Sequence, residues 1–333
     1  MGNSRAVMKV IFQAVLLCSL SACANYQAGP LSETLDAQSQ GTLWFTSNDG
    51  YDFSQYATAP ELIVEGDLVI PPNHNGATVI LSHGSGGVGI VQTTWQRFLN
   101  DHGYATFLLD HFSPRNTINV LHSQVRVTEQ QMSFDVLNAF KILRTHPNIN
   151  PDRIFHIGWS KGATTGILAS LLKVQGLVSP EPSAHKIAGF IEFYPWCGVR
   201  AELQASSPIL ILHGKDDDYT PLKMCEVLVQ DMKTSGSNIQ IERFANAVHG
   251  FDNWFTPPKQ KDSITVRKTT GDCTLRIDPK TLNIRSVSGE FTVDTYDNRK
   301  TFLKACAERG VMYGGSPQHQ DRTEKLVLDF LAK

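Results

Sequence analysis

The 333-residue sequence has little net charge, no Cys-x-x-Cys pair and no Cys/His pair at metal-ligand spacing. A formal net charge of −2 gives no electrostatic reason to expect a nucleic-acid partner. The cysteine spacing disfavours a zinc site. What remains is an ordinary globular composition, with 41% apolar and 19% charged residues.

A basic and apolar segment at the N-terminus predicts export. Arg5 and Lys9 precede an apolar run at 10–20, which is interrupted by Gln13 and is too short to span a bilayer comfortably. The run ends in Leu20-Ser-Ala-Cys23, which resembles a bacterial lipobox. In that motif the cysteine becomes the lipidated first residue of the mature protein.

We therefore expect residues 1–22 to be a lipoprotein-type signal peptide and Cys23 to carry the lipid. The mature protein is then expected to face the periplasm, held by its lipid anchor alone on a bacterial membrane, with the outer membrane favoured. An ordinary signal peptide cut near Ala22 or Ala24 is the alternative.

The remaining cysteines support export. Of six in the chain, one lies in the predicted signal peptide and one at its end, which leaves four. An even number in an exported protein indicates disulfides. We expect sequence neighbours to pair, as Cys197–Cys225 and Cys273–Cys306. Each bridge closes a loop of about 30 residues and contributes roughly 3–4 kcal/mol in the chain-entropy model.

The pattern along the chain predicts an α/β domain. A polar stretch at 25–40 indicates that residues 23–59 are a tether and N-terminal extension, and residues 60–333 form the domain. Apolar strand candidates alternate there with helix candidates, which predicts a mostly parallel sheet with helices on both faces. Strands are expected at 61–70, 77–82, 105–110, 154–157, 187–194, 209–212 and 239–244, and helices at 93–102, 128–145, 163–174, 222–234 and 320–332. Residues 257–315 break the alternation, so we expect an insertion with a small β element.

The most informative stretch is Gly158-Trp-Ser-Lys-Gly162, which lies between an apolar strand candidate and a helix candidate. A serine between two glycines at such a turn is typical of a nucleophile elbow, which exposes the serine hydroxyl. The motif alone arises by chance in roughly one chain in eight of this length. A serine there can also be a simple turn or helix cap, so the assignment depends on partners elsewhere in the chain.

Those partners follow the serine in the order found in α/β-hydrolases. His213-Gly-Lys-Asp-Asp-Asp-Tyr-Thr-Pro221 comes after one buried strand, and Asn246-Ala-Val-His249 comes after the next. A serine nucleophile needs an imidazole to accept its proton and a carboxylate to orient that imidazole. We therefore predict Ser160 as the nucleophile, His249 as the base and one of the three aspartates as the acid.

Together these motifs make the chain resemble α/β-hydrolases of the dienelactone hydrolase family. The resemblance covers residues 60–256 and the final helix. It rests on Leu81-Ser-His-Gly-Ser-Gly-Gly87, Asp110-His-Phe112, Pro151-Asp-Arg-Ile-Phe-His-Ile-Gly-Trp-Ser160, His213-Gly-Lys-Asp-Asp217 and His249-Gly-Phe251. It implies a monomeric hydrolase without a cofactor that cleaves small-molecule carboxylic esters through an acyl-enzyme. Enzymes of this family that act on dienelactones use a cysteine nucleophile, so Ser160 favours a general serine esterase.

The resemblance also assigns supporting roles. The family pattern places the acid three residues after the glycine and four before the proline of its loop, which selects Asp217; its two aspartate neighbours are expected to be solvated. An oxyanion hole is expected from the backbone N–H groups of Ser85 and Lys161. We expect the Lys161 side chain to point to solvent, with attraction of acidic substrates as the alternative. His111 is a candidate for the lining of the site.

Two functions of other classes remain as alternatives. Gly84-Ser-Gly-Gly-Val-Gly89 follows a strand candidate and matches a dinucleotide-binding fingerprint, with Asp110 at the end of the next strand. Three points disfavour such an oxidoreductase: the expected start of the next helix only near Thr93, the likeness of His83-Gly84 to an oxyanion loop, and the expected export. The other alternative is a non-catalytic binding lipoprotein on a hydrolase scaffold, against which the complete triad argues.

Overall fold

The computed structural model describes residues 26–179, 186–267 and 273–333. The predicted signal peptide and Cys23 therefore lie outside the described residues. Within those three ranges, no helix is both long enough and apolar enough to cross a membrane.

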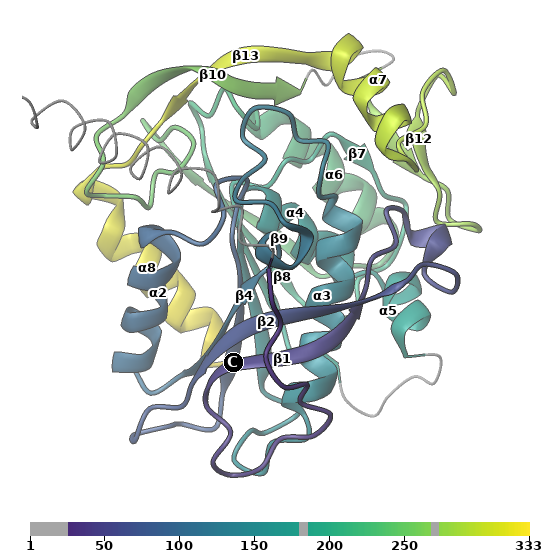
Figure 1. The fold of residues 1–333 in the computed structure, drawn as a ribbon. Helices are drawn as coiled ribbons and strands as arrows, with labels where there is room; N and C mark the ends of the chain where they lie inside the picture. The colour runs from purple at the N-terminus through teal and green to yellow at the C-terminus, as the bar shows by residue number, and fades with distance from the viewer. Residues whose placement is uncertain (1–25, 180–185, 268–272) are drawn as a thin grey trace, which may run out of the picture.

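An eight-stranded sheet forms the centre of the molecule (Figure 1). Its strands lie in the order β1-β2-β4-β3-β5-β6-β8-β9, with antiparallel pairing of β1 with β2 and of β2 with β4, and parallel pairing elsewhere. The strands are β1 (Gly41–Asn48), β2 (Glu61–Val69), β3 (Thr78–Ser82), β4 (Ala105–Asp110), β5 (Ile154–Trp159), β6 (Phe190–Phe193), β8 (Ile209–Gly214) and β9 (Ile239–Phe244). Every residue of β3, β5, β6 and β8 is buried, as expected for parallel strands covered on both faces.

Part of the predicted tether is in fact a strand of the central sheet, β1. Residues 23–59 were expected to be an extension outside the domain, but residues 41–48 pair with β2 along their whole length. Leu43 and Phe45 point into the core, and the Ser47 hydroxyl donates to Asp135 Oδ1 at 2.6 Å. Because Thr and Ser occupy several positions of this strand, its apolar alternation is weak in the sequence.

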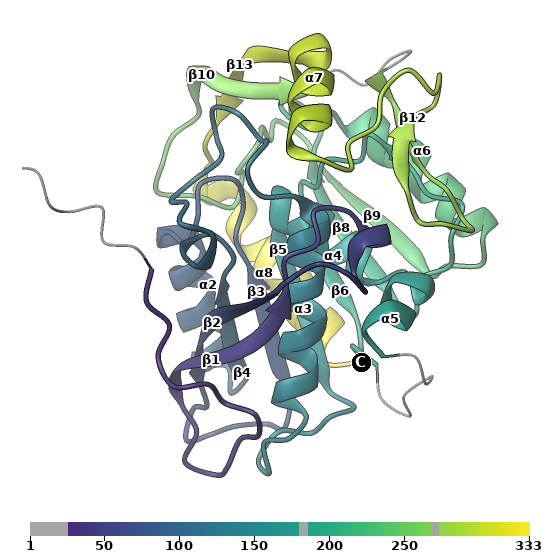
Figure 2. The same ribbon diagram turned by 45° about the vertical axis from the view of Figure 1, so that its right-hand side comes forward.

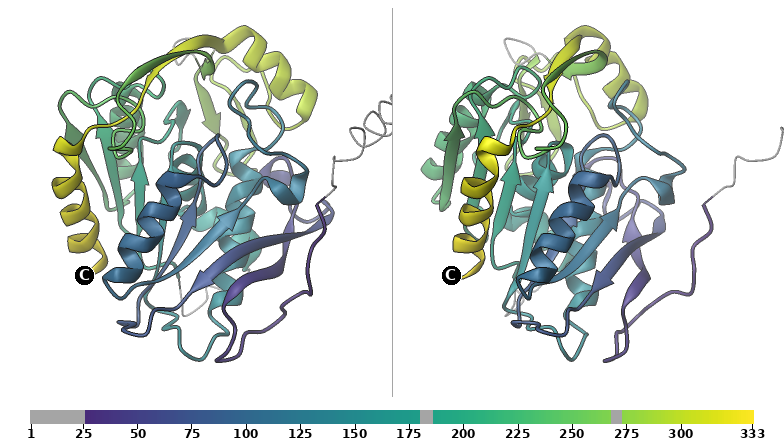
Figure 3. Two further views of the ribbon diagram at one scale, coloured as in Figure 1. Left: turned by 60° about the vertical axis from the view of Figure 1, so that its left-hand side comes forward. Right: turned by 90° about the vertical axis from the view of Figure 1, so that its left-hand side faces the viewer.

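Helices cover both faces of the sheet (Figures 2 and 3). Helices α2 (Ile90–Asp101) and α8 (Gln320–Leu331) lie on one face, and α3 (Glu129–Leu143), α4 (Lys161–Ala169), α5 (Leu172–Val178) and α6 (Leu222–Thr234) on the other. Successive residues of a strand feed the two cores: Val79 and Leu81 pack with α2 and α8, while Ile80 packs with α3 and α4. The single helix predicted at 163–174 is in fact two helices, α4 and α5.

Residues 257–315, which were predicted to be an insertion with a small β element, contain β structure. Its elements are β10 (Lys259–Arg267), β11 (Leu275–Ile277), β12 (Ile284–Ser286), α7 (Tyr296–Cys306) and β13 (Ala307–Tyr313). Strand β10 pairs with β13, and β11 pairs with β12 and with the short β7 (Val199–Arg200). Figure 1 shows β10, β13 and α7 lying across one end of the central sheet. The described residues also include the short 3-10 helices η1 (Phe53–Gln55), η2 (Ser113–Arg115) and η4 (Pro317–His319).

The structure contains both predicted disulfides. Cys197–Cys225 joins the segment after β6 to α6, and Cys273–Cys306 joins the segment before β11 to the end of α7. The second bridge holds the insertion together, as expected. Both therefore stabilise segments next to the carboxyl ends of the parallel strands, where a site is expected in an α/β sheet.

Candidate active site

Ser160 occupies a strained turn between β5 and α4. Its backbone has φ 53° and ψ −110°, a conformation that non-glycine residues rarely adopt. A Cβ on Gly158 would lie 2.3 Å from the carbonyl oxygen of Gly162, and a Cβ on Gly162 would lie 2.2 Å from that of Ser82. Both glycines are therefore required by close backbone contacts, as the predicted nucleophile elbow demands.

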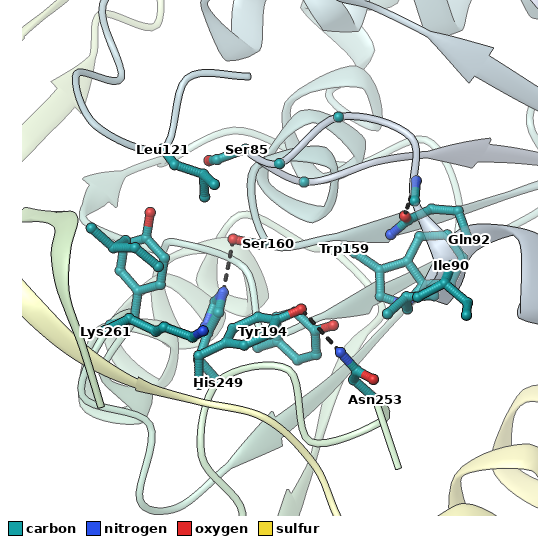
Figure 4. Close-up of a pocket in the computed structure, with 18 of the residues that line it drawn as sticks. Ser85, Ile90, Gln92, Leu121, Trp159, Ser160, Tyr194, His249, Asn253 and Lys261 are labelled. Atoms are coloured by element: carbon teal, nitrogen blue, oxygen red, sulfur yellow. Dashed lines mark hydrogen bonds between the residues drawn. The ribbon is translucent and has the colours of Figure 1, made fainter. Parts of the chain in front are cut away.

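Three strand ends bring the predicted catalytic residues together, and Figure 4 shows two of them, Ser160 and His249. The Ser160 Oγ lies 2.9 Å from His249 Nε2, and His249 Nδ1 lies 2.8 Å from Asp217 Oδ2. The histidine and the aspartate are buried, whereas the serine is partly exposed. Asp216 and Asp218 are exposed, so the structure places only the middle aspartate of the three against the imidazole.

Local hydrogen bonds fix Asp217 as a carboxylate. Its Oδ1 accepts from the backbone N–H groups of Tyr219 and Thr220 at 2.9 and 2.8 Å, and its Oδ2 accepts from the Thr220 hydroxyl at 2.9 Å. Burial raises the pKa of this carboxyl, but His249 and the N–H donors outweigh burial and leave the pKa below its ordinary value. The Tyr219 ring lies 4.6 Å from the His249 imidazole, centroid to centroid, and packs against it.

A second carboxyl group, that of Asp252, is linked to the imidazole through an aromatic residue, and the sequence did not predict it. The Tyr194 ring packs against His249 at 4.6 Å, and its hydroxyl donates to Asp252 Oδ1 at 2.6 Å. The other oxygen of Asp252 accepts from the indole N–H groups of Trp95 at 2.9 Å and Trp159 at 2.8 Å. Burial raises the pKa of Asp252. The Asp252 carboxyl therefore links Trp159, the residue before Ser160, to Tyr194, which packs against the imidazole.

The glycine-rich loop after β3 lies against the elbow. A Cβ on Gly84 would be 3.1 Å from the Trp159 carbonyl oxygen and 3.3 Å from Ser160 Cβ. Ser85 and Lys161, the two residues predicted to form an oxyanion hole, line a common recess with Ser160. Lys161 is also the first residue of α4, and the N-terminus of a helix favours negative charge.

The prediction that the Lys161 side chain points to solvent is wrong. It is 2% exposed and does not point to solvent, because its Nζ lies 3.1 Å from Glu129 Oε1. Glu129 Oε2 in turn lies 2.7 Å from a guanidinium nitrogen of Arg299 on α7. A buried ammonium requires such a counter-ion. Because the ammonium is paired with Glu129, the alternative that it attracts acidic substrates loses its basis.

A cavity of about 440 Å³ opens at Ser160 and His249 (Figure 4). Residues 84–87, Gly89 and the start of α2 form one wall, and the insertion contributes Lys261, Ser263, Ile264 and Tyr313 to another. The described lining residues include no Asp or Glu. The Gly314 N–H donates to the His249 carbonyl oxygen at 2.9 Å, so the end of the insertion is bonded to the loop that carries the imidazole.

His111 does not line this cavity, contrary to expectation. Its imidazole is fully buried, 2.8 Å from Asp135 Oδ2 and 3.0 Å from Ser82 Oγ. The same serine hydroxyl lies 2.9 Å from His156 Nε2, and His156 Nδ1 lies 2.9 Å from Glu192 Oε1. These residues form a polar chain inside the protein that the apolar pattern of the strands did not predict.

Neither a metal centre nor a dinucleotide site emerges from the described part of the chain. There, no group of three or more His, Cys, Asp or Glu side chains could hold a metal ion. Helix α2 begins at Ile90, directly after Gly89, so the expected later start near Thr93 is wrong and no longer counts against a dinucleotide. What counts against it is that the glycine loop packs on Ser160 and lines the cavity of the triad.

Comparison with known proteins places the chain in a family. The model of the dienelactone hydrolase family matches residues 64–265. The chain belongs to the dienelactone hydrolase family. Membership supports hydrolase activity and agrees with the mostly parallel sheet, the covering helices and the serine elbow described above.

Individual relatives of this family member are distant. Two curated proteins of Bacillus subtilis (strain 168), "Uncharacterized peptidase YuxL" and "Uncharacterized peptidase YtmA", are 24% and 23% identical over 59% and 41% of this chain. The alignments span only 35% and 60% of those proteins. Among solved structures, a dienelactone hydrolase from Anabaena variabilis is 18% identical (56% of this chain, 82% of that one, TM-score 0.43). An esterase from Thermogutta terrifontis is 17% identical (57% and 81%, TM-score 0.42). At these scores, the family assignment rests on the family model.

Proposed function

We propose that the protein is a serine hydrolase that cleaves carboxylic esters through an acyl-enzyme. The observation that carries the proposal is the hydrogen-bonded series Ser160–His249–Asp217 at the wall of a ligand-sized cavity. The nucleophile–base distance of 2.9 Å is within the range in which a proton can be transferred directly.

In the proposed reaction, the Ser160 oxygen attacks the ester carbonyl carbon while its proton passes to His249 Nε2. Asp217 holds the imidazole by the Nδ1–H group and stabilises the cation that forms. Collapse of the tetrahedral intermediate expels the alcohol, which takes the proton from His249. Water, deprotonated by the same imidazole, then attacks the acyl-enzyme and releases the acid and free Ser160.

The negative oxygen of the intermediate requires donors, and we assign these to the backbone N–H groups of Ser85 and Lys161. Two observations support the assignment: the loop of Ser85 packs on the elbow, and Lys161 begins α4 next to the nucleophile. The buried pairing of the Lys161 side chain with Glu129 holds the start of this helix in place. A donor of this kind typically contributes about 10²–10³-fold to kcat.

Hydrolysis of p-nitrophenyl acetate tests the proposal. Ser160→Ala is expected to abolish turnover of this ester and labelling by a serine-reactive phosphonate. Ser235→Ala, which changes a serine at the C-terminus of α6, serves as the matched control and is expected to retain both. Full turnover by folded Ser160→Ala would show that the nucleophile is elsewhere. Absence of labelling in the wild type would favour the non-catalytic binding alternative, and tight NAD binding would favour the oxidoreductase.

Peptide hydrolysis is the second candidate reaction, because the two curated relatives are named as peptidases. The same triad can cleave an amide, but the poorer leaving group must be protonated as it departs. A matched set of ester, thioester and amide substrates with one acyl group separates these activities. We expect the ester to have the highest kcat/KM.

We further propose that the protein is exported and held on the membrane by a lipid on Cys23, and that it is a monomer. The two disulfides are consistent with export. Mass analysis of the N-terminal peptide of the mature protein is expected to show a diacylglyceryl-modified cysteine. Light scattering of the detergent-free Cys23→Ala protein is expected to give the mass of one chain.

A further inference from the structure

Three large apolar side chains are exposed beside the mouth of the cavity. Val88, Ile90 and Ile118 have exposed fractions of 42%, 65% and 85%. Ile90 lines the cavity itself and is seen at its edge in Figure 4. Single exposed apolar residues are common on soluble proteins, but a group around one opening indicates a surface that contacts something apolar.

Ile118 joins this group through backbone contacts with the glycine-rich loop. The Val120 N–H donates to the Ser85 carbonyl oxygen at 2.8 Å. A Cβ on Gly87 would lie 2.6 Å from the Ile118 carbonyl oxygen. The segment that carries Ile118 therefore lies directly on the loop that borders the cavity, with its side chain in solvent.

The N-terminal end of the described chain reaches the same place. The Tyr26 N–H donates to Asn116 Oδ1 at 3.0 Å, two residues before Ile118. The predicted lipidation site, Cys23, is only three residues before Tyr26. Three extended residues span at most roughly 10 Å. A lipid on Cys23 would thus attach to the molecule close to Asn116 and to the exposed side chains.

We propose that Val88, Ile90 and Ile118 form a lipid-contacting rim, and that the cavity opens toward the membrane to which Cys23 is anchored. The substrate is then an ester that resides in that membrane and enters the cavity across the rim. This inference rests on the proposed ester hydrolysis and on lipidation of Cys23. It names the substrate class: esters with an acyl chain or alcohol long enough to partition into a bilayer.

The cavity is suited to such a substrate. Its described lining contains no carboxylate and includes the apolar and aromatic side chains of Ile90, Val91, Leu121, Trp159, Tyr219 and Ile264. Polar side chains also line it, among them Gln92, His122, Asn253 and Lys261. The apolar side chains can contact the hydrocarbon part of the ester while its carbonyl group meets the triad.

The test compares rim and control variants on vesicles of phosphatidylethanolamine and phosphatidylglycerol. The rim variant is Val88→Ser/Ile118→Ser, whose two positions do not line the cavity. The control is Leu172→Ser/Val287→Ser, which changes two other exposed apolar side chains, with exposed fractions of 46% and 48%. They lie near α5 and β12, on the opposite side of the molecule from α2 in Figures 1 and 2. Each lipidated protein is assayed with p-nitrophenyl palmitate dissolved in the vesicles and with p-nitrophenyl acetate in water.

The rim variant is expected to hydrolyse the vesicle-borne ester about tenfold or more slowly than wild type, since burial of each such side chain is worth at least about tenfold in partition. Its rate on the soluble ester and both rates of the control variant should be unchanged. The proposal is overturned if the rim and control variants hydrolyse the vesicle-borne ester at equal rates. It is also overturned if the rim variant loses the same share of its rate on both esters. An unmodified Cys23 in the mature protein would overturn it as well.

A binding measurement separates failure of this inference from failure of the proposed function. The mature chain carrying Cys23→Ala, which begins at residue 23 and has neither the lipid nor the apolar run at 10–20, is mixed with the same vesicles, and bound protein is separated by flotation in a density gradient. We expect about tenfold more of it to float than of the same chain carrying the rim substitutions, whether or not it hydrolyses esters. If the two float equally, the rim is refuted even if the protein is an active esterase.

Discussion

The protein holds two sets of serine, histidine and carboxylate with nearly the same hydrogen-bond lengths. We define the pocket set as Ser160, His249 and Asp217, and the core set as Ser82, His156, Glu192, His111 and Asp135. The serine–histidine distance is 2.9 Å in the pocket set and 2.9 and 3.0 Å in the core set. Yet Ser82 is fully buried in β3, whereas Ser160 sits on a strained turn at a cavity. Access and backbone geometry, rather than the hydrogen bonds alone, distinguish a candidate site from structural polar packing.

One pair of the core set, His156 and Glu192, differs in charge from the pocket set, whereas Asp135 of the core set is a carboxylate that the buried Arg115 neutralises. Burial, with a further contribution from His111, lowers the pKa of His156 to about 3, and burial raises the pKa of Glu192 well above its ordinary value. This pair is therefore neutral at pH 7. Asp217 is instead a carboxylate that can stabilise an imidazolium. The His156–Glu192 pair can share a proton but has no charge with which to activate a nucleophile.

The largest expected difference is between the two serines. Ser160→Ala should lower kcat by about 10⁶-fold, as loss of a nucleophile does in other serine hydrolases. Ser82→Ala should leave kcat within a few-fold of wild type, but lower the free energy of unfolding by about 1–3 kcal/mol because two buried imidazole nitrogens lose a partner. Ester assays and urea unfolding measure the two effects. A large loss of kcat in folded Ser82→Ala would break the comparison.

The carboxyl groups should differ next. Asp217→Asn is expected to lower kcat by about 10⁴-fold, because an amide no longer holds the imidazole in the productive tautomer. Glu192→Gln should keep nearly wild-type kcat, since the group is already neutral. Asp218→Asn, at an exposed neighbouring position, is the matched control and should change kcat less than about twofold. A deficit in Glu192→Gln comparable to that of Asp217→Asn would show that the core set takes part in turnover.

The smallest expected effect is on the pH dependence of the free energy of unfolding. Burial lowers the pKa of His156 to about 3 and that of His83 to about 4, from an ordinary 6.5. As pH falls below 6.5, the unfolded chain gains protons that these folded imidazoles do not bind, so stability falls by up to about 1.4 kcal/mol per pH unit for each group. Glu192 acts oppositely, because its raised pKa lets the folded state keep a proton that the unfolded chain releases above pH 4.5.

Urea unfolding between pH 7 and 4.5 tests the predicted direction of this pH dependence. Wild type should become less stable as pH falls, and Glu192→Gln should lose stability more steeply because the opposing contribution is absent. A shallower slope in Glu192→Gln would mean that the carboxyl is ionised in the folded protein.

The pocket set could be predicted from the sequence because its members follow the ends of parallel strands. Loops after neighbouring strands meet at one edge of the sheet, so the order of Ser160, Asp217 and His249 along the chain was informative. The core set could not be found in this way. His156 and Glu192 lie inside apolar strands, and their pairing with Ser82 depends on the lateral order β3-β5-β6, which the sequence does not reveal.

Two further features were not predicted for the same reason, because they depend on contacts between residues far apart in the sequence. The orientation of Lys161 depends on Glu129 and Arg299, which are remote from it in the sequence and adjacent only after folding. Strand β1 escaped notice because its inward positions include Ser47, whose hydroxyl is satisfied by Asp135. In each case a polar residue is buried beside a specific partner, and only the tertiary structure identifies that partner.

The hydrogen bond from Gly314 to the His249 carbonyl oxygen has a consequence for synthesis. The walls of the cavity begin at Gly84 and end at Tyr313, so the chain must be synthesised through Gly314 before the site can close. A chain that ends before Gly314 lacks one wall and the support of its imidazole, and it is expected to show no ester turnover.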